Sequence, residues 1–146
     1  MEGRALQDVL KVHCFGCGSL NPQGMQIKSH VEGDEVVCRW QPPAQYIGYP
    51  GIVYGGTIAS IIDCHAMWTA MAALCRDAGI PIEQSPPVVT GRLMVNYLKP
   101  AKIDQPLELR ARVTDRSEKR FNVECRVLQG GVEVANAEVV AVRAKF

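Results

Sequence analysis

One uninterrupted stretch constrains the fold of this 146-residue chain more than any other, because residues 57–77 contain neither glycine nor proline. Eight side chains in this stretch recur at spacings of three and four residues: Ile58, Ile61, Ile62, His65, Trp68, Met71, Ala72 and Cys75. Gly79 and Pro81, which disfavour helix, follow the stretch. The pattern predicts one long helix with a wide apolar face.

The segments on either side of this helix are typical of β-strands. Residues 25–42 alternate apolar and polar side chains around Gly33 and Asp34, as a β-hairpin does. Beyond the helix, four runs bounded by turn residues are expected to form strands: 88–98, 107–114, 121–129 and 132–144. A short amphipathic helix is expected within residues 4–12.

A single helix among antiparallel strands cannot form parallel βαβ units. We therefore predict an α+β fold in which an antiparallel sheet wraps around one long central helix, as a single domain over residues 1–146. A small sheet of this kind leaves strand edges and one helix face uncovered. We expect a homo-oligomer, either a dimer or a tetramer, to cover them.

The composition excludes several classes of protein. Sixteen basic and 15 acidic residues nearly cancel, and 47% of residues are hydrophobic, which argues against disorder and against a broad nucleic-acid-binding surface. We expect no membrane association, because no apolar run looks long enough to cross a bilayer. Most of the six cysteines fall in apolar segments, and the N-terminus lacks a secretory signal pattern, so we expect a reduced, cytoplasmic protein.

Two glycines and an aspartate mark the candidate site. Gly55 and Gly56 come just before the predicted helix, where backbone N–H groups at its positive end can bind a ligand oxygen or stabilise an oxyanion. Asp63 lies in the apolar run and has no cation three or four residues away. The alternatives are an ordinary tight turn for the glycines and a solvated surface acid for Asp63.

The spacing of these residues predicts how they combine. Asp63 follows Gly55 by eight residues, roughly 12 Å along a helix axis. One helix therefore cannot present both groups to a single carbonyl. Two antiparallel helices across a dimer axis can, which predicts two equivalent sites, each shared between subunits.

Two segments carry a family resemblance: "PGIVYGGTIASIID" at residues 50–63 and "VTGRLMVNYLKPA" at residues 89–101. They resemble the hotdog-fold acyl-CoA thioesterases of the phenylacetate-pathway and 4-hydroxybenzoyl-CoA type. "CFGCG" and "NPQG" also resemble the N-terminal segment of one branch of that family, so the resemblance extends from Cys14 to Arg143. It implies a hotdog fold and hydrolysis of an acyl-CoA thioester to free acid and CoA.

The resemblance also implies roles for individual residues. The Gly55 N–H would bind the thioester oxygen, and Asp63 of the other subunit would act as nucleophile or general base. Thr90 would orient the attacking water; its alternative is an ordinary strand residue. No metal or redox cofactor is implied, since CoA is part of the substrate.

Tyr54 departs from the family pattern, which has histidine before the two glycines. We expect Tyr54 and Gly56 to contact substrate. A phenol can donate a hydrogen bond, but it is longer than imidazole and takes up no proton near neutrality. The alternative function is therefore acyl-CoA binding without turnover. An enoyl-CoA hydratase is a further alternative, but it needs an Asp/His pair, and His65 is expected in the core.

Basic residues and cysteines supply further candidates. Five basic residues at two strand ends are candidates for binding the CoA phosphates: Lys99, Lys102, Arg116, Lys119 and Arg120. The alternative is that these residues lie in hairpin tips exposed to solvent.

The residues His13, Cys14 and Cys17 have the spacing of half a zinc site, and a distant cysteine or a partner chain would have to complete it. We expect no metal there, and expect the loop to cover the acyl pocket. Four large side chains are candidates to shape that pocket: Tyr46, Tyr49, Trp68 and Met71.

Overall fold

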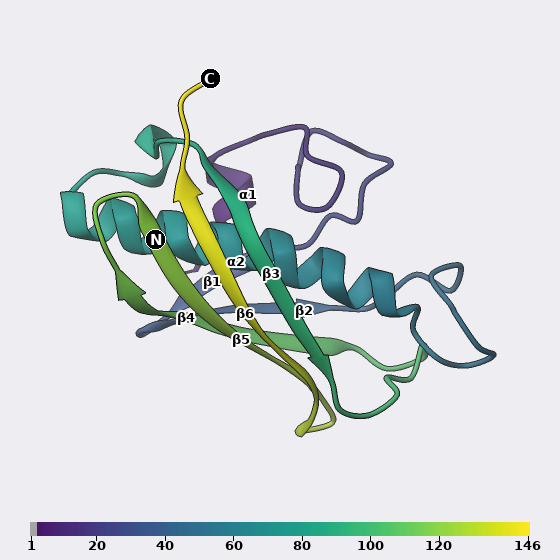
Figure 1. The fold of residues 1–146 in the computed structure, drawn as a ribbon. Helices are drawn as coiled ribbons and strands as arrows, with labels where there is room; N and C mark the ends of the chain where they lie inside the picture. Colours follow the sequence, from purple (N-terminus) through teal and green to yellow (C-terminus); the bar gives the residue numbers. More distant parts are fainter. Residues whose placement is uncertain (1–2) are drawn as a thin grey trace.

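The computed structural model describes residues 3–146 and consists of one long helix packed against a six-stranded antiparallel sheet (Figure 1). The helices are α1 (Leu6–Val9), α2 (Gly55–Ala78) and the short 3₁₀ helix η1 (Ile82–Gln84). The strands are β1 (Ser29–Glu32), β2 (Glu35–Trp40), β3 (Val88–Tyr97), β4 (Leu107–Arg116), β5 (Arg120–Gln129) and β6 (Val132–Arg143). The predicted α+β hotdog arrangement is confirmed.

The strands lie in the order β1-β2-β4-β5-β6-β3, and every neighbouring pair is antiparallel. Residues alternate between the two faces of the sheet, as β5 shows clearly. Its buried side chains, Phe121, Val123, Cys125 and Val127, belong to the hydrophobic core that also contains the buried face of α2. This pleat explains why the alternating pattern of residues 25–42 predicted the β1–β2 hairpin correctly.

Helix α2 begins two residues earlier than predicted, so that Gly55 and Gly56 form its first turn. It ends at Gly79, which has a left-handed backbone (φ 65°) and donates its N–H to the carbonyls of Arg76 and Cys75. This is the helix stop that the sequence predicted, because glycine adopts positive φ without steric cost.

Helix α1 is shorter than predicted. The backbone becomes extended at Leu10 (φ −103°, ψ 102°), so the helical turn covers only residues 6–9 of the expected 4–12. The following segment instead forms a loop held by backbone hydrogen bonds, among them Leu20 N–H to the Val12 carbonyl and Met25 N–H to the Phe15 carbonyl. In Figure 1 this purple segment lies beside the middle of α2.

Strand β3 is an edge strand that pairs only with β6. Four of its large apolar side chains are exposed: Val89, Leu93, Met94 and Tyr97. An uncovered strand edge is one of the two features that led us to expect an oligomer, the other being an uncovered helix face. The oligomeric state remains a prediction.

One expectation about membranes needs correction. By length and composition alone, α2 is long and apolar enough to cross a bilayer, so the statement that no apolar run reaches that length was wrong. Most of this helix is nevertheless buried within the protein. Packing against the sheet accounts for its apolar character, as in the core helix of any globular α+β domain.

Candidate active site

The side chains of Asp63 and Thr90 meet between the middle of α2 and the start of β3. The Thr90 hydroxyl donates a hydrogen bond to a carboxylate oxygen of Asp63. A β-bulge interrupts the pairing of β3 with β6 between Thr90 and Arg92. Bulges bend a strand and re-aim its side chains, and this one lies directly at Thr90. Gly91 suits the position, because a Cβ there would lie 2.8 Å from the Val142 side chain.

Asp63 and Thr90 border a cavity of about 540 Å³, a size suited to a small organic ligand. Its walls come from α2, the N-terminal loop and the start of β3. The lining is mostly apolar or sulfur-containing, and includes Val12, Cys14, Cys17, Cys64, Met67, Trp68, Met71, Val88 and Val89. Trp68 and Met71 therefore line this cavity, and the Cys14 loop forms one of its walls. That the cavity holds an acyl group stays a prediction. Tyr46 and Tyr49 lie outside this cavity.

A second cavity, of about 720 Å³, lies at the N-terminus of α2. Tyr49, Tyr54, Gly55, Tyr97 and Lys99 are among its lining residues. Gly55 and Gly56 are the first two residues of the helix, so their N–H groups have no carbonyl acceptor within it. The intrahelical pattern starts with Thr57 and Ile58, whose N–H groups reach the Tyr54 carbonyl. Free donors at a positive helix end suit an anionic or carbonyl oxygen.

Two tyrosines enclose this helix end. The Tyr97 hydroxyl donates a 2.7 Å hydrogen bond to the Gly55 carbonyl. Burial and the neighbouring Tyr54 raise the pKa of Tyr97, so its hydroxyl stays a donor at neutral pH. The ring of Tyr54 lies over Gly56, where a Cβ would come within 2.6 Å of a ring carbon. The close approach of this ring explains the second glycine.

The two halves of the predicted site are separate within one chain. Gly55 and Asp63 line different cavities, in keeping with the roughly 12 Å expected between them along the helix. The basic candidates are also divided. Lys99 lies beside Gly55, whereas Arg116 forms an ion pair with Asp77 near the far end of α2 (3.2 Å).

Lys119 and Arg120 lie with Arg116 in the exposed β4–β5 hairpin. Asp77 follows Gly55 by 22 residues, which places this hairpin roughly 33 Å from Gly55 along α2. Lys102 pairs through its backbone with the Gln129 side chain near the Gly55 end. A single chain therefore does not bring all five cations to one ligand.

His65 is a core residue, as predicted. It is fully buried, accepts a 2.8 Å hydrogen bond from the Ser29 hydroxyl at Nδ1, and donates a 2.8 Å hydrogen bond from Nε2 to the Val36 carbonyl. Gln7 completes the network with two hydrogen bonds to Ser29. Burial lowers the pKa of His65 to about 4. A neutral His65 with both ring nitrogens in use is no partner for Asp63.

Two residues near the site escaped sequence analysis as functional candidates. Tyr97 appeared only as a strand residue, and the Tyr-x-x-Pro pattern that ends β3 was the available signal. Cys64 directly follows Asp63, and its sulfur lies 3.8 Å from that of Cys14. Hydrogen bonds from Cys64, Trp68 and Cys14 lower the pKa of Cys17, while the bond to Cys17 and burial raise that of Cys64. Cys14 and Cys64 are 50 positions apart in the chain, so no local sequence pattern predicted their contact.

Known proteins with the same architecture include thioesterases. Residues 50–136 match the family model described as the thioesterase superfamily. A thioesterase superfamily protein from Shewanella loihica PV-4 is 30% identical, with a TM-score of 0.73 over 95% of this chain and 99% of that one. No protein of curated function matches the chain.

Two more distant structures share the fold. The PaaI protein of the E. coli phenylacetic acid degradation operon is 15% identical, with a TM-score of 0.69 over 83% of this chain and 81% of that one. A phenylacetic acid degradation-related protein from Ralstonia eutropha JMP134 is 20% identical, with a TM-score of 0.65 over 81% of this chain and 85% of that one. At these identities the likeness is one of fold.

Proposed function

This chain belongs to the thioesterase superfamily, and from that premise we propose that it hydrolyses an acyl-CoA thioester to the free acid and CoA. The observation that carries the proposal is the hydrogen bond from Thr90 to Asp63 at the edge of the 540 Å³ cavity. A half-buried carboxylate beside an apolar chamber suits attack on an acyl group held in that chamber.

Asp63 supplies the base or the nucleophile in this proposal. As general base, its carboxylate takes a proton from a water molecule, whose oxygen attacks the thioester carbon. As nucleophile, a carboxylate oxygen attacks that carbon directly, and water then hydrolyses the anhydride. In both cases the tetrahedral intermediate collapses by expelling the CoA thiolate. Thr90 holds the carboxylate in place through its hydroxyl.

The Gly55 N–H supplies the oxyanion contact from the other subunit. The free amide at the positive end of α2 supports this role, because negative charge develops on the thioester oxygen as the intermediate forms. Antiparallel pairing of two α2 helices places the Gly55 of one protomer beside the Asp63 of its partner. The exposed apolar side chains of β3 support dimerisation along this side of the molecule.

The nucleotide end of CoA lies, in this proposal, in the cavity at the helix N-terminus. Tyr54 lines this cavity beside the Gly55 amide, and Lys99 supplies a cation for a phosphate group. Gly56 is not among the residues that line the cavity, so its predicted contact with substrate stays a prediction. Arg116, Lys119 and Arg120 reach the same CoA only if another protomer brings them there. This division makes Lys99 the first cation to test.

The decisive experiment follows thiol release with a chromogenic disulfide over aromatic, short-chain and long-chain acyl-CoAs. We expect wild type to release thiol with at least one class, and Asp63→Asn to lose about 10²- to 10⁴-fold in rate, as removal of a general base does. Asp34→Asn is the matched control, because Asp34 is an exposed acid in the β1–β2 turn. Circular dichroism checks that all three proteins fold alike.

The same assay distinguishes the alternatives. If wild type binds acyl-CoA but releases no thiol, the proposal of hydrolysis is overturned, and a non-catalytic acyl-CoA-binding protein is favoured. The reason for considering that alternative is that Tyr54 stands where the family pattern has histidine. Where thiol is released, single-turnover hydrolysis in H₂¹⁸O tests for the anhydride. Label incorporated into Asp63 indicates an anhydride opened at the Asp63 carbonyl, whereas label only in the released acid indicates that water attacked the acyl carbon, either of the thioester or of the anhydride.

A further inference from the structure

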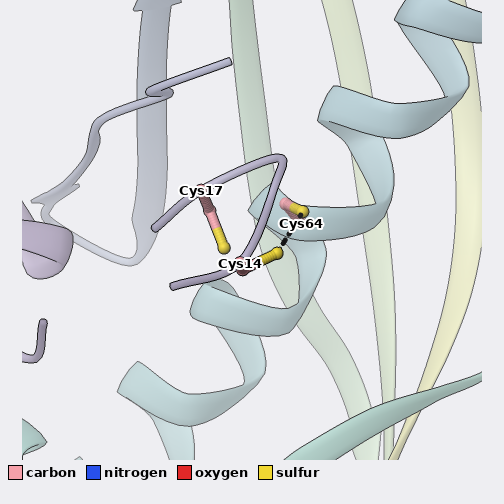
Figure 2. A group of neighbouring side chains, drawn as sticks. All are labelled: Cys14, Cys17 and Cys64. Atoms are coloured by element: carbon pink, nitrogen blue, oxygen red, sulfur yellow. Dashed lines mark hydrogen bonds between the residues drawn. The ribbon is translucent and has the colours of Figure 1, made fainter. Parts of the chain in front are cut away.

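Three cysteines from two distant parts of the chain converge beside the Asp63 cavity. Cys14 and Cys17 belong to the N-terminal loop, and Cys64 belongs to α2 (Figure 2). Their three sulfur atoms all lie within 4.8 Å of one another. Cys64 is thus the distant cysteine that the C-x-x-C pair lacked in the sequence.

The spacing of the sulfurs matches that of metal-bound thiolates. Two ligands at a zinc–sulfur distance of about 2.3 Å, separated by a tetrahedral angle, are about 3.8 Å apart. The Cys14 and Cys64 sulfurs are 3.8 Å apart, as the dashed line in Figure 2 marks. A cation equidistant from all three sulfurs therefore requires only small side-chain rotations.

The loop is shaped so that its cysteines can reach the helix. Gly16 lies directly against Cys64, and a Cβ at Gly16 would come within 2.4 Å of the Cys64 sulfur. Gly18 closes the turn with an N–H bond to the Cys14 carbonyl (2.8 Å), and a Cβ there would lie 2.4 Å from the Cys14 nitrogen. Gly16 is thus explained by the approach of the loop to Cys64, and Gly18 by the tight turn of the loop backbone itself.

The three cysteines differ in burial, and the loop that carries two of them is held in place. Cys17 is buried, Cys64 is half-buried, and Cys14 remains open to solvent. Backbone hydrogen bonds from Met25 to Phe15 and from Ile27 to Gly16 fix the loop before any ligand arrives. A preformed set of thiols costs little conformational entropy on binding, which favours affinity.

We propose that Cys14, Cys17 and Cys64 form a binding site for a thiophilic divalent cation such as Zn²⁺. Each thiol releases its proton to solvent and binds as thiolate, so three ligands are supplied by the chain. The fourth position belongs to water from the cavity that these cysteines line, which leaves the Asp63 carboxylate free. The cation ties the loop to α2 beside the cavity wall. This proposal departs from our prediction from the sequence that the loop holds no metal.

Metal titration of the reduced, chelator-treated protein tests the proposal. We expect one Zn²⁺ per chain by native mass spectrometry, and Co²⁺ to give thiolate-to-metal absorption with the intensity of tetrahedral coordination. Cys64→Ser should weaken Zn²⁺ binding by more than the roughly 10- to 100-fold that loss of an outer-shell partner costs. Cys75→Ser is the matched control, because Cys75 is a buried cysteine of α2 outside the cluster.

Gly16→Ala provides a second variant that keeps all three thiols. Its methyl group should displace the Cys64 sulfur and weaken Zn²⁺ binding while leaving a folded protein. Differential alkylation of wild type needs no variant, and bound Zn²⁺ should protect all three cysteines from the reagent. The proposal is overturned if wild type binds less than one Zn²⁺ per chain, if Cys64→Ser binds it as tightly as wild type, or if Zn²⁺ leaves Cys64 alkylation unchanged.

Discussion

The hydroxyl of Thr90 donates a hydrogen bond to the carboxylate of Asp63, although the two residues are 27 positions apart in the chain. This contact joins an edge strand to the middle of the long helix, at the margin of an apolar cavity. A carboxylate held by one hydroxyl keeps its remaining lone pairs for water or substrate. The Asp63–Thr90 pair therefore connects the packing of α2 and β3 with the proposed chemistry.

Removing only the Thr90 hydroxyl should impair turnover more than binding. A hydrogen bond to a charged group contributes about 1.5–3 kcal/mol, so Thr90→Val should lower kcat by roughly 10- to 100-fold with little change in KM. Thr90→Ser keeps the hydroxyl and should restore most of the rate. Steady-state thiol release on the best substrate measures both. Equal rates for wild type and Thr90→Val would remove Thr90 from the mechanism.

A pair of substitutions at Gly55 tests the backbone amide. Gly55→Pro removes the N–H at the first helical position, where proline is well tolerated, and the Tyr54 backbone (φ −57°, ψ 129°) suits a residue before proline. Loss of one oxyanion donor should cost about 10²- to 10³-fold in kcat. Gly55→Ala keeps the N–H, and its Cβ would make ordinary contact with the Tyr97 ring at 3.5 Å.

We therefore expect Gly55→Ala to stay active and Gly55→Pro to be inactive but folded, as judged by thermal melting. If both variants lose activity equally, crowding against Tyr97 rather than the missing amide is responsible. If both stay active, the Gly55 N–H takes no part in the reaction.

Mixing two inactive variants tests whether the site is shared between subunits. A heterodimer of Asp63→Asn and Gly55→Pro chains contains one site with both defects and one with neither, if Gly55 and Asp63 come from different chains. The heterodimer is prepared by co-expression of the two chains with different purification tags. Because one of its two sites is intact, it should show about half of the wild-type rate per dimer, whereas each parent variant alone should be inactive. A heterodimer as inactive as its parents would place both groups in one chain. A monomeric wild type would exclude the shared site altogether.

His65 should make the fold sensitive to acid. Burial lowers its pKa to about 4, against about 6.5 in an unfolded chain, so between these values the unfolded state binds a proton that the folded state does not. Stability therefore falls as pH decreases from 6.5 to 4, by about 3 kcal/mol for this group. Urea unfolding across that range, with a chelator present, measures the loss.

His65→Gln is the matched variant, because a glutamine amide can both donate to the Val36 carbonyl and accept from the Ser29 hydroxyl. Its stability should change less between pH 6.5 and pH 4 than that of wild type. Parallel pH profiles for the two proteins would show that another group carries the acid sensitivity.

Local pattern in the sequence determined the elements and the family. The three- and four-residue spacing within 57–77 located α2, alternation located the β1–β2 hairpin, and β-like runs between turn residues located the other four strands to within a few residues of their observed ends. Gly55, Gly56 and Asp63 stood out because each breaks the local rule for its position. These signals can be found in the sequence because helices and strands repeat their side-chain directions over residues that are close together in the chain.

Only the tertiary structure decided which distant residues meet. The contact of Thr90 with Asp63 beside a β-bulge, the hydrogen bond from Tyr97 to the Gly55 carbonyl, and the approach of Cys64 to Cys14 and Cys17 have no local signature. Each depends on how β3 pairs with β6 or on how a loop packs across α2. Such contacts arise from register and packing between segments tens of residues apart, which no window along the chain encodes.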